Sequence, residues 1–139
     1  MNEPITATRV PDNRCMRFLP DTVGYRHMLY AEDLMYCWAA QLSADYQGGS
    51  WDFFKLSNGG AFAAPARPAH LRLLVAGNGA DVVLSAEAAG VTFWLFMLGQ
   101  LASQAAGDAE TDRFAELYHQ LRDFACAHPE AAGILAAID

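Results

Sequence analysis

The sequence predicts an α+β fold, in which a small antiparallel β-meander packs against about four helices, one of them very apolar and central. Three features predict this class. Strand-like segments are grouped between residues 51 and 84, helical periodicities lie on both sides of them, and the turns are short and rich in Asn and Gly. Such turns favour antiparallel neighbours, and a strand cluster followed by a helix cluster is typical of α+β domains.

The length and composition predict one domain with a short N-terminal arm. The 139 residues are 53% hydrophobic and 18% charged, which suits a filled core that needs no disulfide or metal. We expect residues 1–13 to form the arm, around an extended stretch at Ile5–Val10, and residues 14–139 to form the domain. Pro20 disfavours helical geometry at Leu19, so we expect a break there.

A helix is predicted from about His27 to Asp45, because apolar residues recur there at the spacing of one helical face. The glycine pair Gly48-Gly49 ends it. The residues expected on the inward face of this helix are Tyr30, Leu34, Trp38 and Leu42.

Four strands are predicted next. Trp51–Leu56 has the period-2 pattern of a half-buried strand, and Asn58-Gly59 supplies a two-residue hairpin turn. The following strands are expected at Ala61–Ala64, Leu71–Ala76 and Val82–Leu84. The aromatic residues of this region fit either core packing or a stacking platform for single-stranded nucleic acid, and the few cations nearby favour core packing. These aromatic residues are Tyr46, Trp51, Phe53, Phe54 and Phe62.

The most apolar helix is predicted to run from an N-cap at Ser85 to Gly107. No residue from Ala88 to Gly107 carries a charge. A membrane span needs about 20 predominantly apolar residues, and the nearly continuous apolar block Val91–Leu98 is less than half of that length. A helix that is apolar all round is also expected at the centre of a globular core, and this is the interpretation we favour.

Two further helices are predicted at the end of the chain, the first from Asp108 to His128 and a short one that Pro129 starts. The apolar positions of the first are Phe114, Leu117, Tyr118, Leu121, Phe124 and Ala125. A polar stripe lies nearly opposite them, formed by Asp112, Glu116, His119 and Asp123. Its Glu-x-x-His spacing occurs in di-iron bundles, but those need a second such motif, so we expect a solvated face and no metal.

The net charge of the chain indicates which kinds of partner it can bind. Nine Lys+Arg against sixteen Asp+Glu give a net charge of −7. Nucleic-acid affinity rests on cationic contacts, so direct nucleic-acid binding is not expected. An acidic protein could imitate the phosphates of DNA with its carboxylates. Here the acidic residues are sparse, and Arg113 and Arg122 interrupt the predicted helix that contains most of them. Three cysteines without a Cys-x-x-Cys pair, and an N-terminus unlike a signal peptide, predict a reduced, cytoplasmic monomer without a membrane segment.

No catalytic signature is present. The chain has no Gly-x-Ser-x-Gly elbow and no complete phosphate loop. We therefore expect a protein that is not an enzyme and has no cofactor. Because catalytic partners meet in space and not in sequence, a small cytoplasmic hydrolase or DNA-processing enzyme with a His/carboxylate or Cys–His site is the alternative. Its candidate histidines are His27, His70, His119 and His128.

Several motifs resemble one family. They are Arg17-Phe-Leu-Pro20, the run from Tyr46 to Gly60 closed by Ala64-Pro65, Val75-Ala-Gly-Asn-Gly79, Ser85-Ala-Glu-Ala-Ala-Gly90, and the closing region from Tyr118 to His128-Pro-Glu-Ala. In this order and spacing they are similar to the antirestriction proteins of the ArdB/KlcA type. The chain departs from the family pattern at Ala61-Phe62-Ala63, where members commonly have Phe-Tyr-Met.

The resemblance implies a function. Proteins of this kind protect incoming plasmid DNA against type I restriction enzymes, and they have an α+β fold with no established catalytic residue or cofactor. The partner it implies is the host restriction machinery or an associated host protein, and the action it implies is a non-catalytic protein interaction or an indirect route. Exposed loops on a scaffold carry function disproportionately, so we expect the contact patch at loop ends. Its candidate residues are Asp45, Tyr46, Gly48, Gly49 and Asn58, with Asp139 as a second anionic point.

Overall fold

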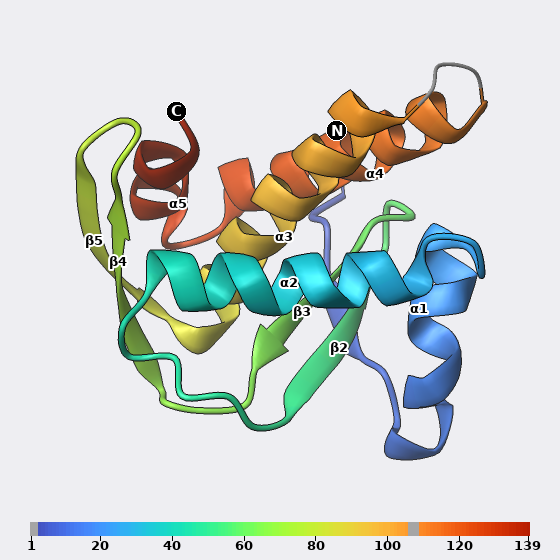
Figure 1. Cartoon of the computed structure of the whole chain (residues 1–139), viewed down its shortest axis with the longest axis horizontal. Coiled ribbons are helices and arrows are strands. Elements are labelled where there is room, and N and C mark those ends of the chain that lie inside the picture. The colour runs from blue at the N-terminus through green and yellow to red at the C-terminus, as the bar shows by residue number, and fades with distance from the viewer. Residues whose placement is uncertain (1–2, 106–108) are drawn as a thin grey trace.

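The computed structural model describes residues 3–105 and 109–139, and within them it confirms the α+β class. The described residues form five α-helices and five strands (Figure 1). Every strand pairs antiparallel with its neighbour. The single meander that we expected is divided. The strands form one three-stranded and one two-stranded sheet, because the connection between the third and fourth strands leads from one sheet to the other.

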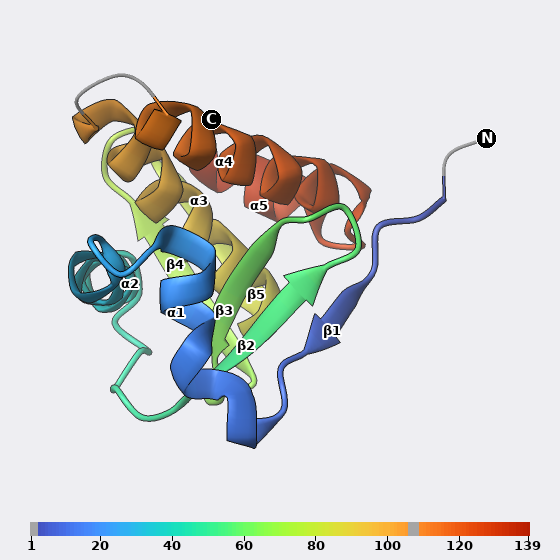
Figure 2. The ribbon, with the colours of Figure 1, turned by 90° about the vertical axis from the view of Figure 1, so that its right-hand side faces the viewer.

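The first sheet contains β1 (Ala7–Arg9), β2 (Trp51–Leu56) and β3 (Ala61–Pro65), in that order (Figure 2). The segment expected as an arm thus supplies an edge strand, with Ala7 opposite Leu56. Val10 continues this attachment, since its N–H donates to the Phe53 carbonyl at 2.7 Å and its side chain is buried.

The β2–β3 hairpin has a three-residue loop in place of the expected two. The Leu56 N–H donates to the Gly60 carbonyl at 2.8 Å, and the Gly59 N–H donates back to the Leu56 carbonyl at 3.1 Å. Gly59 has a φ of 96°, the left-handed position that a three-residue hairpin loop requires. Glycine is therefore needed here for the turn itself.

The second sheet pairs β4 (His70–Val75) with β5 (Ala80–Ser85). Leu71, Leu73 and Val75 are buried and alternate with exposed residues, so one face of this sheet points to the core. The strands predicted for both segments are confirmed, with β4 beginning one residue earlier than expected and β5 two residues earlier.

The expected break at Pro20 is wrong. A short 3₁₀ turn, η1 (Asp12–Arg14), leads into helix α1 (Cys15–Val23), which contains Pro20. Proline inside a helix costs about 3 kcal/mol or more. Burial outweighs this cost, since each large apolar side chain contributes roughly 1.5–3 kcal/mol. Phe18 stacks on Phe53 of β2 at a centroid distance of 4.7 Å, and Leu19 is also buried.

Helix α2 (Met28–Leu42) confirms the helix predicted before the glycine pair, but its inward face is rotated. The buried residues are Ala31, Leu34, Met35, Ala39 and Leu42. Tyr30 and Trp38 lie at the edge, where they donate to the side-chain oxygens of Gln104 at 2.8 Å and Gln100 at 2.9 Å. Ala31 and Ala39 are small, so the inward face of α2 can approach its neighbours closely. The bulkier Tyr30 and Trp38 therefore lie at the edge of this face.

Helix α3 (Ala86–Gln104) is the centre of the molecule. Ser85 caps it as predicted, because its side-chain oxygen accepts the Ala88 N–H at 3.1 Å. Helices α2, α4 and α5 and strands of both sheets contact it (Figures 1 and 2), and its residues 88–95 are all buried. Its expected end at Gly107 and the expected start of the next helix at Asp108 lie outside the described residues.

One glycine permits the contact between α3 and the first sheet. A Cβ atom added at Gly90 would lie 2.4 Å from the Cβ of Ala64 and 2.5 Å from the carbonyl oxygen of Ala63. No real Cβ approaches other atoms so closely. Gly90 therefore sets the distance between α3 and β3.

The last helices are α4 (Ala109–Ala127) and α5 (Ala131–Ile138). The apolar face predicted for α4 is buried, with Tyr118 at its edge, and the stripe of Asp112, Glu116, His119 and Asp123 is exposed as predicted. Among the described residues, no helix combines the length and the apolar character that crossing a membrane requires.

Candidate functional site

Four of the six candidate contact residues lie in the α2–β2 loop, and three of these four line one hollow. Asp45, Gly48 and Gly49 line a hollow of about 420 Å³ together with Arg67 and Pro68 of the β3–β4 connection. The Asp45 carboxylate accepts the backbone N–H of Arg72 at 2.8 Å, which ties the loop to β4. We call Asp45, Gly48 and Gly49 the loop patch.

Both glycines of the loop patch are required for its backbone shape. Their φ angles are 84° and 98°, in the left-handed region that other residues rarely adopt. Nothing lies within 4 Å of the Cβ that either position would carry, so the space beside them is open.

Tyr46 is a structural residue of the same loop. Its hydroxyl accepts the indole N–H of Trp51 at 3.0 Å, and the two rings pack edge to face at 5.7 Å. Trp51 is buried, so Tyr46 satisfies a donor that would otherwise lose its partner in the core.

Asn58 lies at the other end of β2 and away from the loop patch. Its side-chain amide donates to the Gln120 carbonyl of α4 at 2.9 Å and accepts the Gly60 N–H at 3.0 Å. These two bonds fix the hairpin loop against α4. A strand of six residues spans roughly 20 Å, so the length of β2 separates Asn58 from the loop patch.

Asp139 is also separate from the loop patch. It follows α5, and its carboxylate lies 3.4 Å from the Arg122 guanidinium of α4. Both side chains are partly exposed, and such a pair contributes about 0–1 kcal/mol. The six candidates therefore occupy three places on the molecule.

The structure brings together two of the family-like motifs in a polar junction that the sequence did not reveal. The Glu130 carboxylate accepts the Ser85 N–H at 2.8 Å and the Ser85 hydroxyl at 2.6 Å. Next to it, His128 and Glu87 form a pair with an Nε2–Oε2 distance of 2.7 Å. These bonds join the start of α3 to the start of α5, across 45 residues of sequence.

The polar junction is arranged for structure. Nδ1 of His128 accepts the Glu130 N–H at 3.0 Å, so the neutral ring carries its proton on Nε2 and donates it to Glu87. The Ser85 hydroxyl is directed at Glu130 while its oxygen caps α3. Neither ring nitrogen is free to act as a base, and no hydroxyl proton is shared between Ser85 and His128.

Glu130 couples this junction to pH. Burial acts to raise the pKa of Glu130, but the hydrogen bonds from the Ser85 hydroxyl and N–H, together with the nearby His128 and His70, outweigh it, so the pKa lies below its ordinary value of 4.5. A lowered folded-state pKa means that the stabilisation is present above about pH 4.5 and is lost as the pH falls through the folded-state value.

We expect Glu130→Gln to flatten the acid side of the stability profile. Near pH 7 it should lower the free energy of unfolding by about 1.5–3 kcal/mol, the usual value of hydrogen bonds to a charged group. The difference from the unchanged protein should shrink below pH 4. Urea unfolding between pH 3 and 7 measures this, with exposed Glu116→Gln as the control. Parallel curves for the unchanged protein and Glu130→Gln would contradict the assignment.

The other histidines are divided between one pair and two exposed positions. His27 Nε2 lies 2.9 Å from Oε2 of Glu110, and the His27 ring packs against Phe114. His70 and His119 are exposed. Within the described residues, no three His, Cys, Asp or Glu side chains are close enough to hold a metal ion.

Comparison with known proteins identifies the family. The model of the antirestriction protein family matches residues 44–139. The chain belongs to the antirestriction protein family. Antirestriction protein KlcA of Escherichia coli is 46% identical over 138 residues, which cover 98% of this chain and 94% of KlcA. The uncharacterised protein YfjX of E. coli K12 is 38% identical, with 97% of this chain and 88% of YfjX covered.

A solved structure of the family has the same fold. It superposes with a TM-score of 0.91 at 42% sequence identity and covers 100% of this chain and 98% of that one. It is described in the words "The structure of the KlcA and ArdB proteins show a novel fold and antirestriction activity against Type I DNA restriction systems in vivo but not in vitro". The family resemblance noted in the sequence motifs is thereby confirmed.

Proposed function

We propose that this protein relieves type I restriction of incoming DNA in the cytoplasm, through non-catalytic contact with the restriction machinery or an associated host protein. The observation that carries the proposal is the likeness over the whole chain to a KlcA/ArdB structure whose activity is described as present in vivo but not in vitro. An inhibitor that needs a component of the living cell would behave in this way.

The hydrogen bonds of the histidine side chains support an action that involves no catalysis. The one nearly buried histidine, His128, has both ring nitrogens occupied, and its neighbour Ser85 caps a helix. The His27–Glu110 pair is the geometry that favours the enzyme alternative. Single His→Gln variants at positions 27, 70, 119 and 128 test it. If all four variants remain folded and protect DNA normally, histidine-dependent catalysis is ruled out.

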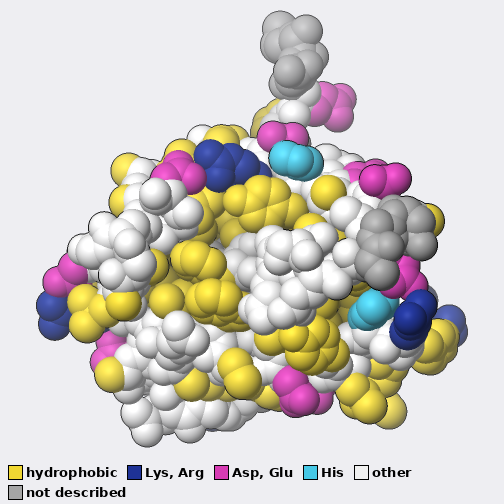
Figure 3. All heavy atoms as spheres, turned by 45° about the horizontal axis from the view of Figure 1, so that its top comes forward, with side chains coloured by type: hydrophobic (Ala, Val, Ile, Leu, Met, Phe, Trp, Pro, Cys, Tyr) yellow, Lys and Arg dark blue, Asp and Glu magenta, His cyan; other side chains and the backbone are white. Residues whose placement is uncertain are grey.

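The distribution of charge supports a protein contact over mimicry of DNA. A mimic needs negative charges at a spacing comparable to phosphates, which lie about 1.7 Å apart along the duplex axis. On the face in Figure 3 the acidic side chains are spread around the rim, with hydrophobic side chains between them. Several carboxylates are also paired with arginines, as in the bidentate pair of Arg72 and Asp81 at 2.6 and 2.8 Å.

We place the contact at the loop patch, with Asp139 as a second point. Asp45 is the charged group of the loop patch, and the open space beside Gly48 and Gly49 lets another surface approach the backbone. Asp45→Asn removes the charge but keeps an oxygen that can accept the Arg72 N–H. Deletion of Asp139 removes one exposed ion pair.

At least one of these two changes should impair protection while stability is kept. We expect about a tenfold loss, the effect of roughly 1.4 kcal/mol of binding, with a change in unfolding free energy within about 0.5 kcal/mol. The measurement is the plating efficiency of unmodified phage on cells with a type I system, with and without the protein. Asp33→Asn, an exposed charge on α2, is the matched control.

Two results are decisive for this proposal. Equal restriction with and without the unchanged protein would refute the antirestriction function. Full protection by both variants, or protection lost only in step with thermal stability, would show that the contact lies elsewhere.

A further inference from the structure

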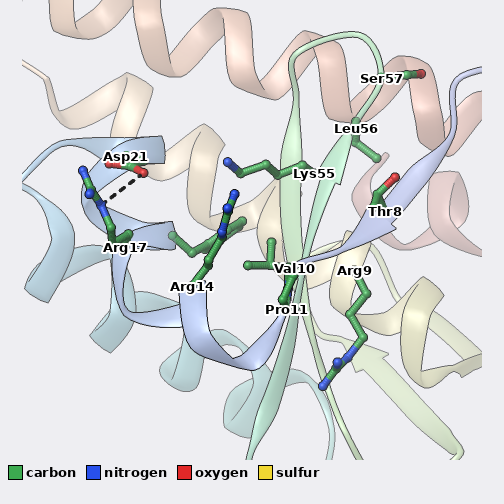
Figure 4. Close-up of a pocket in the computed structure, with 11 residues that line it drawn as sticks. Thr8, Arg9, Val10, Pro11, Arg14, Arg17, Asp21, Lys55, Leu56 and Ser57 are labelled. Carbon is green, nitrogen blue, oxygen red and sulfur yellow. Dashed lines mark ion pairs between the residues drawn. The ribbon is translucent and has the colours of Figure 1, made fainter.

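A pocket of about 580 Å³ lies between the N-terminal segment, α1 and β2 (Figure 4). Its floor is apolar and buried, formed by Val10, Phe18 and Leu56. The Phe18 ring stacks on Phe53 and packs edge to face with Trp94 at a centroid distance of 5.7 Å, which fixes its position. Because these side chains are packed in the core, the pocket is preformed.

The rim of this pocket concentrates positive charge in an acidic protein. Four of the nine lysines and arginines line it, although the chain has a net charge of −7. We call it the cationic pocket, and its cations are Arg9, Arg14, Arg17 and Lys55.

Two of these cations are neutralised within the protein. Arg9 donates to Asp52 at 3.0 and 3.2 Å and to Asp12 at 3.0 Å, and in Figure 4 its side chain points away from the others. Arg17 turns towards Asp21, at 3.9 Å. Both arginines therefore have local acidic partners.

Arg14 and Lys55 are different. Neither has an ion-pair partner among residues 3–105 and 109–139. In Figure 4 both side chains extend into the space between α1 and β2, so that two uncompensated positive charges face the same hollow. Like charges repel when close together, and an anion between them would relieve that repulsion.

We propose that the cationic pocket binds the phosphate group of a small phosphate monoester, held between Arg14 and Lys55. A phosphate monoester carries a charge of about −1.5 to −2 near pH 7, which matches two free cations better than a single carboxylate does. Arginine and lysine are also the side chains that bind phosphate most strongly. The site is independent of the loop patch and of the antirestriction proposal.

The size and lining of the pocket also fit such a ligand. Ligand sites are typically about 300–1,000 Å³, with apolar walls and a few polar groups. The apolar floor can accept the body of the ligand while the cations hold its phosphate. A single phosphate needs only local cations, so the net charge of −7 is no obstacle.

Amide NMR of the full chain tests the proposal, with adenosine 5′-monophosphate, adenosine and inorganic phosphate as probes. We expect saturable shifts at residues 8–18 and 55–57 with the two phosphate-bearing probes, in roughly the millimolar range or tighter. Adenosine should bind at least tenfold more weakly than its monophosphate. Equal binding of adenosine, shifts elsewhere on the chain, or the absence of saturable shifts would overturn the proposal.

Variants separate the site from general electrostatics. Arg14→Gln and Lys55→Gln should each weaken binding of the monophosphate by about tenfold. Arg26→Gln removes an exposed arginine outside the pocket and should leave binding unchanged. Circular dichroism checks that the three variants share one thermal midpoint. Equal weakening in all three variants would reduce the effect to net charge and refute the site.

A second pair of probes tests whether the phosphate monoester can belong to the 5′ end of a nucleic-acid strand as well as to a small molecule. A trinucleotide with a 5′-phosphate and the same trinucleotide with a 5′-hydroxyl differ only in the terminal monoester. Binding of the phosphorylated strand at residues 8–18 and 55–57 would support the site and include strand ends among its ligands. Tight binding of the hydroxyl form there would contradict recognition of a monoester.

Discussion

Gly90→Ala is expected to destabilise the protein by about 2–4 kcal/mol, although alanine favours helices over glycine by about 1 kcal/mol. The added methyl group would lie 2.4–2.5 Å from Ala63 and Ala64 of β3, and two of those three contacts are to backbone atoms. The backbone of a paired strand cannot move aside as the end of a flexible side chain can. Helix α3 and β3 would have to separate.

Gly99→Ala is the matched control in the same helix. A Cβ at Gly99 would lie 3.7 Å from the Tyr118 ring, which is ordinary contact. There the helix preference of alanine should dominate and raise the free energy of unfolding by up to about 1 kcal/mol. Urea unfolding of both variants measures the difference. Similar stabilities for Gly90→Ala and Gly99→Ala would refute the close approach of α3 to β3.

Phe62→Ala is expected to cost about 3–5 kcal/mol, the range for a large aromatic residue in a core. Phe62 is fully buried, and its ring stacks on Phe54 at 4.8 Å and on Phe124 at 5.7 Å. It therefore joins the first sheet to α4, and its removal would leave a cavity between them.

Tyr25→Ala is the control for this change. Tyr25 is 76% exposed, so its truncation should change the free energy of unfolding by no more than about 0.5 kcal/mol. Calorimetry or urea unfolding compares the two. A small loss for Phe62→Ala would contradict core packing and reopen the stacking platform as a role for these aromatic residues.

Local patterns predicted most of the elements because those elements obey local rules. The periodicity of α4 and the cap at Ser85 each depend on residues within one or two helical turns of one another. Helix α1 was missed because Pro20 is a strong local signal against a helix. The burial of Phe18 beneath Phe53, 35 positions away, outweighs that signal and is invisible to local patterns.

The candidate site was predictable only in part, for a similar reason. Gly48 and Gly49 mark a loop by composition, and the structure keeps them beside Asp45. Asn58 was grouped with them because both loops adjoin β2, but the strand separates its two ends. Glu130 binds Ser85, and Arg14 and Lys55 line the same pocket. The two residues of each pair are about 40 positions apart in the sequence, and no spacing rule connects residues so far apart.

The position of α5 has a consequence for how the protein is made. Ile134 and Ala137 are completely buried, and α5 contacts both α3 and β5. The two-stranded sheet of β4 and β5 would not be stable alone, since a two-stranded sheet is marginal in water without packing partners. A growing chain therefore lacks one wall of its core until residue 137 has left the ribosome. The core is therefore closed only after residue 137 has been synthesised, and chains interrupted before α5 would expose the apolar surface of α3 and become substrates for chaperones and proteases.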